Sequence, residues 1–442
     1  MSNDKSRSKA IPKSRLGRFS RVARMAGGVA AGMLSEGARQ LSQGNRPKMS
    51  QMLLTPSNAK RVAKQLSTMR GAAMKVGQLL SMETSEYLSK ELSDILAQLR
   101  DKAFTMPRAQ LEAQLKAAYG DEWHQRFAEF DFEPLAAASI GQVHRATTLD
   151  AEEIVLKIQY PGVAESIDSD VDNIAALLRV TNLLPKHMDI APLLKDAKAQ
   201  LHEEADYRLE ADHLQSFYAL FGEHDDYLVP KLYPDLSTEN VLAMEYVESA
   251  PIEALTDLDP ADLDIMVSKL FALTFDEAFE LRMMQTDANF ANYRYQYSSR
   301  KIVLLDFGAT RHFSKQFASN YKRLLRAVLA DDAAQIIAAA DRLGYQASSA
   351  SDEYQRFLVE VFRVALEPLA HDGLYDFASA RLSDRLSEMT EAVYGFKEFW
   401  QAPPTDILYL HRKLGGIFML ATRLGARVNV NGLLTPHLKR LS

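Results

Sequence analysis

The stretch that decides the fold is residues 301–313, KIVLLDFGATRHF. An apolar run typical of a buried strand, Ile302–Leu305, leads directly into an acid, Asp306. The next two residues are expected to form a turn, in which Gly308 can adopt backbone conformations that other residues avoid. A carboxylate at the end of such a strand can reach a Mg²⁺ ion that bridges phosphates. The same letters also suit an ordinary strand followed by a turn, so the pattern needs support from elsewhere in the chain.

That support comes from residues 285–292, QTDANFAN, in which Asp287 and Asn292 lie five positions apart. This is the spacing of the protein-kinase catalytic loop, in which the acid orients a hydroxyl or a water and the amide holds a metal. An ordinary helix cap and turn is the alternative. In the run EEIVLKIQY, Lys157 supplies a strand lysine that a kinase fold places on the α- and β-phosphates of ATP.

The composition indicates a soluble globular protein of 442 residues, 47% hydrophobic and 25% charged. It has no cysteine, which excludes disulfides, thiolate zinc sites and cysteine nucleophiles, and suits a reducing compartment. Residues 1–49 hold eleven Lys or Arg against two acids, although the whole chain has a net charge of −6. The apolar run at 25–34 in this segment is too short for a membrane span. We expect a flexible tail or a segment that binds an anionic membrane surface.

The pattern along the chain predicts an α+β protein with a bilobal, protein-kinase-like fold. Helical periodicity precedes residue 119, two strand-like runs form a hairpin near 141–160, and helix dominates the last two hundred residues. LVPKLY and NVLAMEYV are predicted as two further strands. The expected segments are a basic segment (1–49), a helical extension (50–129), an N-lobe with inserted helices (130–248) and a helical C-lobe (249–442).

In family terms, the chain resembles the UbiB/AarF (ABC1-type) atypical kinase-like proteins associated with ubiquinone biosynthesis. The resemblance rests on six motifs in family order: RGAAMKVGQLLSM, PLAAASIGQVHRA, VLKIQYPGV, an ExD pair, QTDANFAN and the DFG tripeptide. Gln285 and the stretch LHRKLGGIFMLATRLGARV are similar to the mitochondrial coenzyme Q branch. Ala288 departs from that branch, where proline is usual.

The resemblance implies ATP or ADP and Mg²⁺ as cofactors. Mg²⁺ is expected at Asn292 and Asp306, Asp287 is expected as the base or water-orienting residue, and Lys157 as the phosphate clamp. The ion-pair partner of Lys157 is expected to be Glu210. On a single helix the side chains of Glu204 and Glu210 would point about 240° apart. The two acids could therefore not face the same point, and only one of them is assigned to Lys157.

The remaining expected site residues come from three other segments. Glu204 and Asp206 form the family's special acid pair. Lys75 and Gln78 lie one helical turn apart in the KxGQ motif, and the resemblance implies that this helix blocks peptide substrates. A loop of Ala136, Ala137, Ala138 and Ser139 stands where kinases have a glycine-rich loop, and Glu245 with Val247 is expected to bind adenine through the main chain.

Three functions stay open at this point. The first is an ATPase that supports ubiquinone or isoprenoid lipid biosynthesis, the second a small-molecule or lipid kinase, and the third a nucleotide-sensing scaffold with negligible turnover. Expected partners are a nucleotide, an isoprenoid or quinone-precursor lipid, an anionic membrane surface and ubiquinone-biosynthesis proteins, without nucleic acid. The expected location is cytoplasmic or peripheral on a membrane, and the mitochondrial matrix if the source is eukaryotic.

Overall fold

The structure is a computed structural model that describes residues 71–73, 75–77, 105–180, 190–255, 257–287, 289–393 and 404–439. The basic segment 1–49, most of the KxGQ helix and the departure at position 288 lie outside these residues. The chain divides into two compact units. The N-terminal unit runs through Gln215 and includes Lys231–Tyr246, and the C-terminal unit comprises Ser216–Pro230 and Val247–Ser442.

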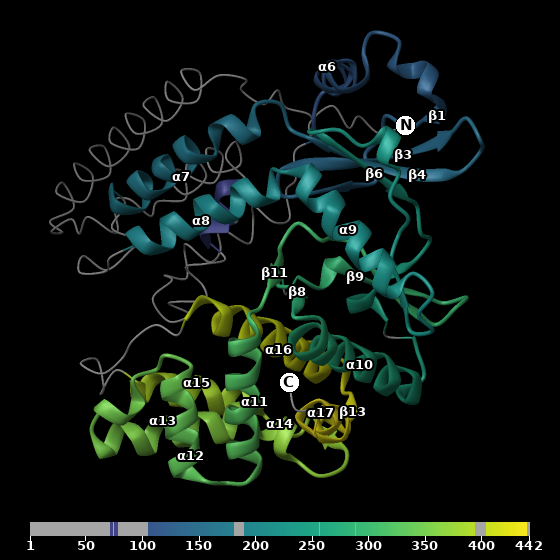
Figure 1. The fold of residues 1–442 in the computed structure, drawn as a ribbon. Coiled ribbons are helices and arrows are strands. Elements are labelled where there is room, and N and C mark those ends of the chain that lie inside the picture. Colours follow the sequence, from purple (N-terminus) through teal and green to yellow (C-terminus); the bar gives the residue numbers. More distant parts are fainter. Residues whose placement is uncertain are drawn as a thin grey trace, which may run out of the picture. The chain divides into compact units, whose positions relative to one another are not determined.

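The N-terminal unit is built on an antiparallel sheet of order β1-β3-β4-β6, with β2 paired to β3 (Figure 1). Its strands are β1 (Phe127–Phe130), β2 (Ala136–Ala137), β3 (Gly141–Thr148), β4 (Glu153–Gln159) and β6 (Val241–Glu245). The predicted hairpin is therefore present as β3 and β4, joined by a turn. Every second residue of β3 from His144 to Thr148 is buried, while β4 is buried from Ile154 to Gln159, as its apolar sequence requires.

The helices of this unit are α6 (Arg108–Tyr119), α7 (Val163–Val180), α8 (Ala191–Glu204) and the first part of α9 (Tyr207–Phe221). The helices α7 and α8 pack side by side (Figure 1). They fill the interval between Lys157 and Glu210 that the sequence predicted to hold inserted helices. A hydrophobic core beneath the sheet includes Leu111, Trp123 and Ile154.

One prediction about these helices is wrong, because Glu204 and Glu210 do not share a helix. The helix α8 ends at Glu204, and α9 begins at Tyr207. Between them, the carboxylate Oδ1 of Asp206 accepts hydrogen bonds from the backbone N–H groups of Arg208 and Leu209, each at 3.1 Å. Asp206 thus caps the start of α9, and an aspartate in this position favours a new helix over continuation of the old one.

The C-terminal unit combines short strands with a helical bundle (Figure 1). Its strands are β5 (Tyr227–Leu228), β7 (Ala250–Pro251), β8 (Met283–Gln285), β9 (Tyr293–Gln296), β10 (Lys301–Leu304), β11 (Thr310–His312), β12 (Tyr375–Asp376) and β13 (Arg427–Val428). Its helices are the last part of α9, α10 (Pro260–Phe275), α11 (Lys315–Leu329), α12 (Ala333–Arg342), α13 (Asp352–Ala365), α14 (Glu367–Ala370), α15 (Leu382–Val393), α16 (Thr405–Leu424) and α17 (Val430–Lys439).

The helix α10 forms the centre of this unit and packs against α16 and α17. Most of its side chains from Leu263 to Phe275 are buried, which matches its apolar sequence. A π-helical turn, Asp276–Leu281, extends it to the strand β8. No helix in the described part of the chain has the length and hydropathy that a membrane crossing requires.

The predicted strand LVPKLY is also wrong. Leu228 ends the two-residue strand β5, which pairs in parallel with β10, and Pro230 lies two residues further along the chain. Proline has no N–H for a sheet ladder. Beyond it, Leu232 forms only an isolated bridge with Met244.

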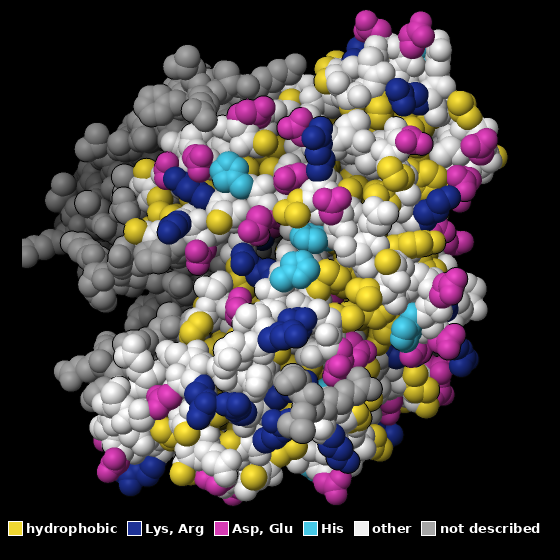
Figure 2. Space-filling model, viewed as in Figure 1, with side chains coloured by type: hydrophobic (Ala, Val, Ile, Leu, Met, Phe, Trp, Pro, Cys, Tyr) yellow, Lys and Arg dark blue, Asp and Glu magenta, His cyan; other side chains and the backbone are white. Residues whose placement is uncertain are grey.

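Charged side chains of both signs are interspersed over the face drawn in Figure 2. The structure includes exposed ion pairs such as Arg145–Glu153 and Arg381–Asp384. Exposed pairs of this kind contribute roughly 0–1 kcal/mol each. Removing one member of the buried ion pairs described below is expected to destabilise the fold by much more than this.

Candidate active site

The two stretches that decided the fold are joined by backbone hydrogen bonds in the C-terminal unit. The N–H of Leu305 donates to the carbonyl of Asn292 at 3.1 Å, and the N–H of Thr286 donates to the carbonyl of Ala309 at 3.0 Å. The strands β8 and β11 also pair, with Gln285 opposite Thr310. The loop that carries Asp287 and the turn that follows Asp306 are thus held in one fixed arrangement.

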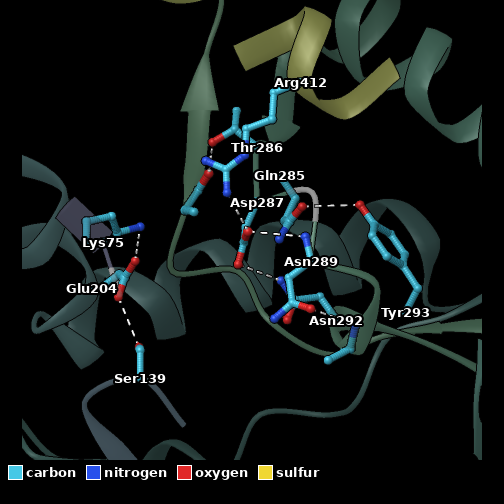
Figure 3. Close-up of polar contacts among 12 residues, drawn as sticks. Lys75, Ser139, Glu204, Gln285, Thr286, Asp287, Asn289, Asn292, Tyr293 and Arg412 are labelled. Atoms are coloured by element: carbon cyan, nitrogen blue, oxygen red, sulfur yellow. Dashed lines mark hydrogen bonds and ion pairs between the residues drawn. The ribbon is translucent and has the colours of Figure 1, made fainter. Parts of the chain in front are cut away.

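The carboxylate of Asp287 lies at the centre of this arrangement (Figure 3). Its Oδ1 accepts hydrogen bonds from the backbone N–H of Asn289 and from Nη2 of Arg412, both at 3.2 Å. Its Oδ2 accepts one from Nδ2 of Asn292 at 3.1 Å. The sequence prediction that Asp287 and Asn292 act together is therefore consistent with direct contact between their side chains.

The donor set at this loop fits Mg²⁺. Because Asn292 donates through Nδ2, its amide oxygen is the atom left to ligate a cation. Asp306 is partly buried, and its Oδ1 accepts the N–H of Gly308 at 3.0 Å, which fixes the carboxylate at the turn. Among the described residues, no group of three or more His, Asp or Glu side chains is arranged so that it could hold a metal ion by itself. One carboxylate and one amide, completed by phosphate oxygens and water, is a set that Mg²⁺ accepts.

In the N-terminal unit, Lys157 forms an ion pair with Glu210. Its Nζ lies 2.6 and 2.9 Å from the two carboxylate oxygens of Glu210. The two side chains are 11% and 1% exposed. A buried pair of this kind fixes the ammonium on β4 against α9. The predicted ion pair between Lys157 and Glu210 is therefore present in the structure, although the argument for it assumed one continuous helix.

A second ion pair in this unit joins Lys75 of the KxGQ helix to Glu204 at the end of α8 (Figure 3). The other carboxylate oxygen of Glu204 accepts a hydrogen bond from Oγ of Ser139 at 3.0 Å. A Cβ on Gly71 would lie 2.8 Å from Cγ2 of Ile140, so the helix approaches the loop closely and requires glycine there. The KxGQ helix, the alanine loop and α8 are thus connected. Gln78 lies outside the described residues.

The alanine loop is an extension of the sheet. Ala136 and Ala137 form β2 against β3, and the N–H of Ala138 donates to the carbonyl of Gly141 at 2.9 Å, which closes a tight turn. A Cβ on Gly141 would lie 2.4 Å from the carbonyl oxygen of Ile158, so glycine is required where β3 approaches β4. The loop is therefore held both by its pairing with β3 and by the hydrogen bond from Ser139 to Glu204.

Replacing Ala138 by glycine is expected to increase the affinity for ATP by a few-fold and to change the ratio of ATP to ADP affinity. The lost methyl frees the backbone at the turn, whereas its direct effect on stability is about 1 kcal/mol or less. Calorimetric titration of MgATP and MgADP measures both constants. Ala128→Gly, at an exposed alanine of β1 in the same sheet, is the control. Equal affinities in Ala138→Gly and the wild type would contradict the assigned role of the loop.

The predicted adenine-binding residues flank the point in the sequence at which one unit ends and the next begins. Glu245 ends β6, and its backbone N–H and its carboxylate contact the carbonyl and the N–H of Lys231. The carbonyl of Val247 accepts a hydrogen bond from Oγ of Ser249 at 3.0 Å. The unit boundary falls between Tyr246 and Val247.

Sequence reasoning missed three residues that contact the catalytic loop. Lys413 forms a buried ion pair with Glu277 and donates to the carbonyl of Gln285 at 2.9 Å. Burial raises the pKa of the Glu277 carboxyl and lowers the pKa of the Lys413 ammonium, and each charge opposes the shift of the other. The third missed residue is Arg412, which donates a hydrogen bond to Asp287. The available signal was the tripeptide His411-Arg412-Lys413 in a largely apolar helix, where charge is unusual.

One family model and several known proteins are similar to this chain. A sequence model of the ABC1 atypical kinase-like domain matches residues 98–340. "Atypical kinase COQ8, mitochondrial" of Saccharomyces cerevisiae is 35% identical over 428 residues, which cover 96% of this chain and 85% of that protein. "Atypical kinase COQ8B, mitochondrial" of Rattus norvegicus is 35% identical over 432 residues, with coverage of 96% and 81%.

Among solved structures, Rv3197 of Mycobacterium tuberculosis, determined in complex with erythromycin, is similar with a TM-score of 0.61. It is 22% identical, and the match covers 87% of this chain and 97% of that one. This likeness concerns the fold alone. The match to the domain model and to these two relatives confirms the resemblance seen in the motifs: the chain belongs to the ABC1 atypical kinase-like family.

Proposed function

We propose that this chain is a magnesium-dependent ATPase of the atypical kinase type that supports ubiquinone or isoprenoid lipid biosynthesis. The observation that carries the proposal is the arrangement of Asp287, Asn292 and Asp306 on two loops joined by backbone hydrogen bonds. Positioning and charge stabilisation supply most of the catalysis in phosphoryl transfer, and this arrangement can provide both.

Each residue has a proposed task. Asn292 and Asp306 hold Mg²⁺, which neutralises charge on the phosphates when it is bound. Asp287 orients the attacking water through the acceptor position that remains on its Oδ2. Lys157, kept on β4 by Glu210, binds phosphate oxygens. Glu245 and Val247 contact the adenine through their backbone.

Peptide phosphorylation is not the proposed reaction. Lys75, Glu204 and Ser139 connect the KxGQ helix to the alanine loop, and the loop carries methyl groups where kinases have glycine. A loop restrained by these contacts can still bind a nucleotide, but it supports transfer of phosphate to few kinds of acceptor molecule. Asp206, by contrast, has a structural part as the cap of α9.

The link to quinone lipids rests on the relatives. Two proteins named as COQ8-type atypical kinases match nearly the whole chain, and both names include the word mitochondrial. We propose a quinone-precursor or isoprenoid lipid as the molecule whose handling depends on ATP, with an anionic membrane surface and ubiquinone-biosynthesis proteins as partners.

Replacing Asp306 by asparagine is expected to weaken magnesium-dependent ATP binding at least about 10-fold, because a neutral amide replaces a charged ligand of a hard cation. A thermal-shift titration with ATP and Mg²⁺ measures the change. The matched control is Asp384→Asn, an exposed carboxylate on α15 that pairs with Arg381. Unchanged affinity in Asp306→Asn would show that the metal assignment is wrong.

The same purified chain distinguishes the reaction. Phosphate release that vesicles with anionic lipid and a phenol-like lipid stimulate is the expected result. Transfer of labelled γ-phosphate to the lipid would instead make the protein a lipid kinase. Magnesium-dependent ATP binding without either reaction would make it a nucleotide-sensing scaffold.

A further inference from the structure

Three consecutive residues of α16 contact the catalytic loop and the helices around it. Lys413 donates to the carbonyl of Gln285, two residues before Asp287. Arg412 points at Asp287, and its Nη2 donates to Oδ1 at 3.2 Å (Figure 3). The Nε2 atom of His411 is hydrogen-bonded to the hydroxyl of Tyr321 on α11 at 2.9 Å. One turn of helix, far along the sequence, therefore contacts both the backbone and the acid of the loop.

The contact of Arg412 restricts which atom of Asp287 can act. A carboxylate has about four acceptor positions. Oδ1 uses two of them, for Arg412 and the N–H of Asn289, and Oδ2 uses one, for Asn292. The remaining position is on Oδ2. Arg412 therefore fixes the rotation of the carboxylate and directs its last acceptor position to one side.

The anchor of this helix turn is Lys413 and not Arg412. The side chains of Lys413 and its partner Glu277 are 2% and 1% exposed, whereas those of Arg412 and Asp287 are 16% and 23% exposed. Burial lowers the pKa of His411 to about 4, so its ring is neutral near pH 7 and adds no charge to the cluster. Loss of Arg412 should therefore leave the helix in place and free only the carboxylate.

From this geometry we infer that Arg412 is a positioning residue for the phosphoryl-transfer reaction, acting through Asp287. The inference rests on the proposed function, because it assigns to Arg412 the orientation of the residue that directs the attacking water. Arg412 touches neither nucleotide nor metal ligand in this assignment. Its removal should lower kcat and leave the KM for ATP unchanged.

The test is a double-mutant cycle on the full chain with MgATP, comparing Arg412→Ala, Asp287→Asn and the double variant. In the wild-type background, Arg412→Ala is expected to lower kcat about 10- to 100-fold, the scale for a misplaced catalytic group. KM should change by less than about threefold. In the Asp287→Asn background, the same substitution should lower kcat by less than about twofold, because the residue it positions has lost its function.

Two further variants separate positioning from stability. Arg412→Lys should recover part of the kcat lost in Arg412→Ala. Lysine keeps the positive charge beside Asp287, but its ammonium does not reproduce the planar geometry of the guanidinium. Arg423→Ala removes a mostly exposed arginine of the same helix, whose partner is Glu253. It should leave kcat unchanged. The melting temperature of Arg412→Ala should stay within a few degrees of the wild type, as expected for loss of a partly exposed pair.

The outcomes are distinguishable from those of the proposed function. If the wild type hydrolyses ATP and the losses from Arg412→Ala and Asp287→Asn multiply in the double variant, the positioning role is wrong and the ATPase stands. An increase in KM with unchanged kcat also overturns it. A wild type without magnesium-dependent nucleotide binding overturns the proposed function, and the positioning role with it.

Discussion

Replacing Asp287 by asparagine is expected to lower kcat for ATP hydrolysis by roughly 10²- to 10⁴-fold, the range for loss of a positioned acid–base group. The amide keeps one oxygen for Arg412 and the N–H of Asn289. Its nitrogen is a donor and cannot accept from Asn292 or from an attacking water. The affinity for MgATP should change by less than about threefold, because the carboxylate proposed to hold the metal is Asp306.

Single-turnover and steady-state hydrolysis, with binding measured separately by calorimetry, test this expectation. Asp384→Asn is again the control. A parallel loss of affinity and kcat in Asp287→Asn would place Asp287 among the groups that bind nucleotide or metal, and would remove it as the residue that orients water.

Replacing Lys413 by methionine is expected to lower the free energy of unfolding by about 3–5 kcal/mol, the usual loss when one member of a buried ion pair is removed. Methionine fills similar volume but leaves the Glu277 carboxylate buried without its cation. The carbonyl of Gln285 also loses a donor. A change of this size corresponds to a lower melting temperature by roughly 10 °C in a unit of this size.

Thermal unfolding of the full chain measures the effect, and two comparisons identify its cause. The double variant Glu277→Gln with Lys413→Met should recover much of the loss, because no charge stays unpaired. Arg423→Ala, which removes the exposed ion pair between an arginine of the same helix and Glu253, should change the melting temperature by no more than a few degrees. A double variant no more stable than Lys413→Met would show that packing, and not charge, causes the loss.

The pH dependence of Lys413→Met follows from the position of Glu277. Burial raises the pKa of this carboxyl, and without Lys413 no ammonium opposes the shift. A group whose pKa is higher in the folded state contributes stability at low pH and loses it as the pH rises. The deficit relative to the wild type should therefore be larger near about pH 8 than near about pH 6. An opposite trend would contradict the charge argument.

The parts of the fold and site that the sequence predicted are those determined by local pattern. Alternating and continuous apolar runs predicted the strands β3 and β4 because strand burial has a period that can be read directly. The spacing of Asp287 and Asn292 placed two contacting side chains on one loop, since five residues of chain limit their separation. Lys157 was recognisable because it interrupts an apolar strand.

What the sequence did not reveal depends on contacts between distant segments. Lys413 and Glu277 are 136 residues apart, and neither has a neighbour in the sequence that indicates its partner. The break between α8 and α9 was missed because Asp206 was interpreted as a site acid, although aspartate before a helical run is equally a start signal. In both cases one residue type serves two purposes, and only the packed structure shows which one applies.

The helix α9 has a consequence for any attempt to study the two units separately. Its first residues belong to the N-terminal unit, and from Ser216 onward it belongs to the C-terminal unit. In the latter, Phe217 packs against Phe307 with ring centroids 4.8 Å apart. A fragment that begins at Val247 would lack this phenylalanine and also β5, the parallel neighbour of β10. The exposed edge of β10 would then be free to pair with other molecules, so such a fragment should aggregate on expression even though it contains every proposed metal ligand.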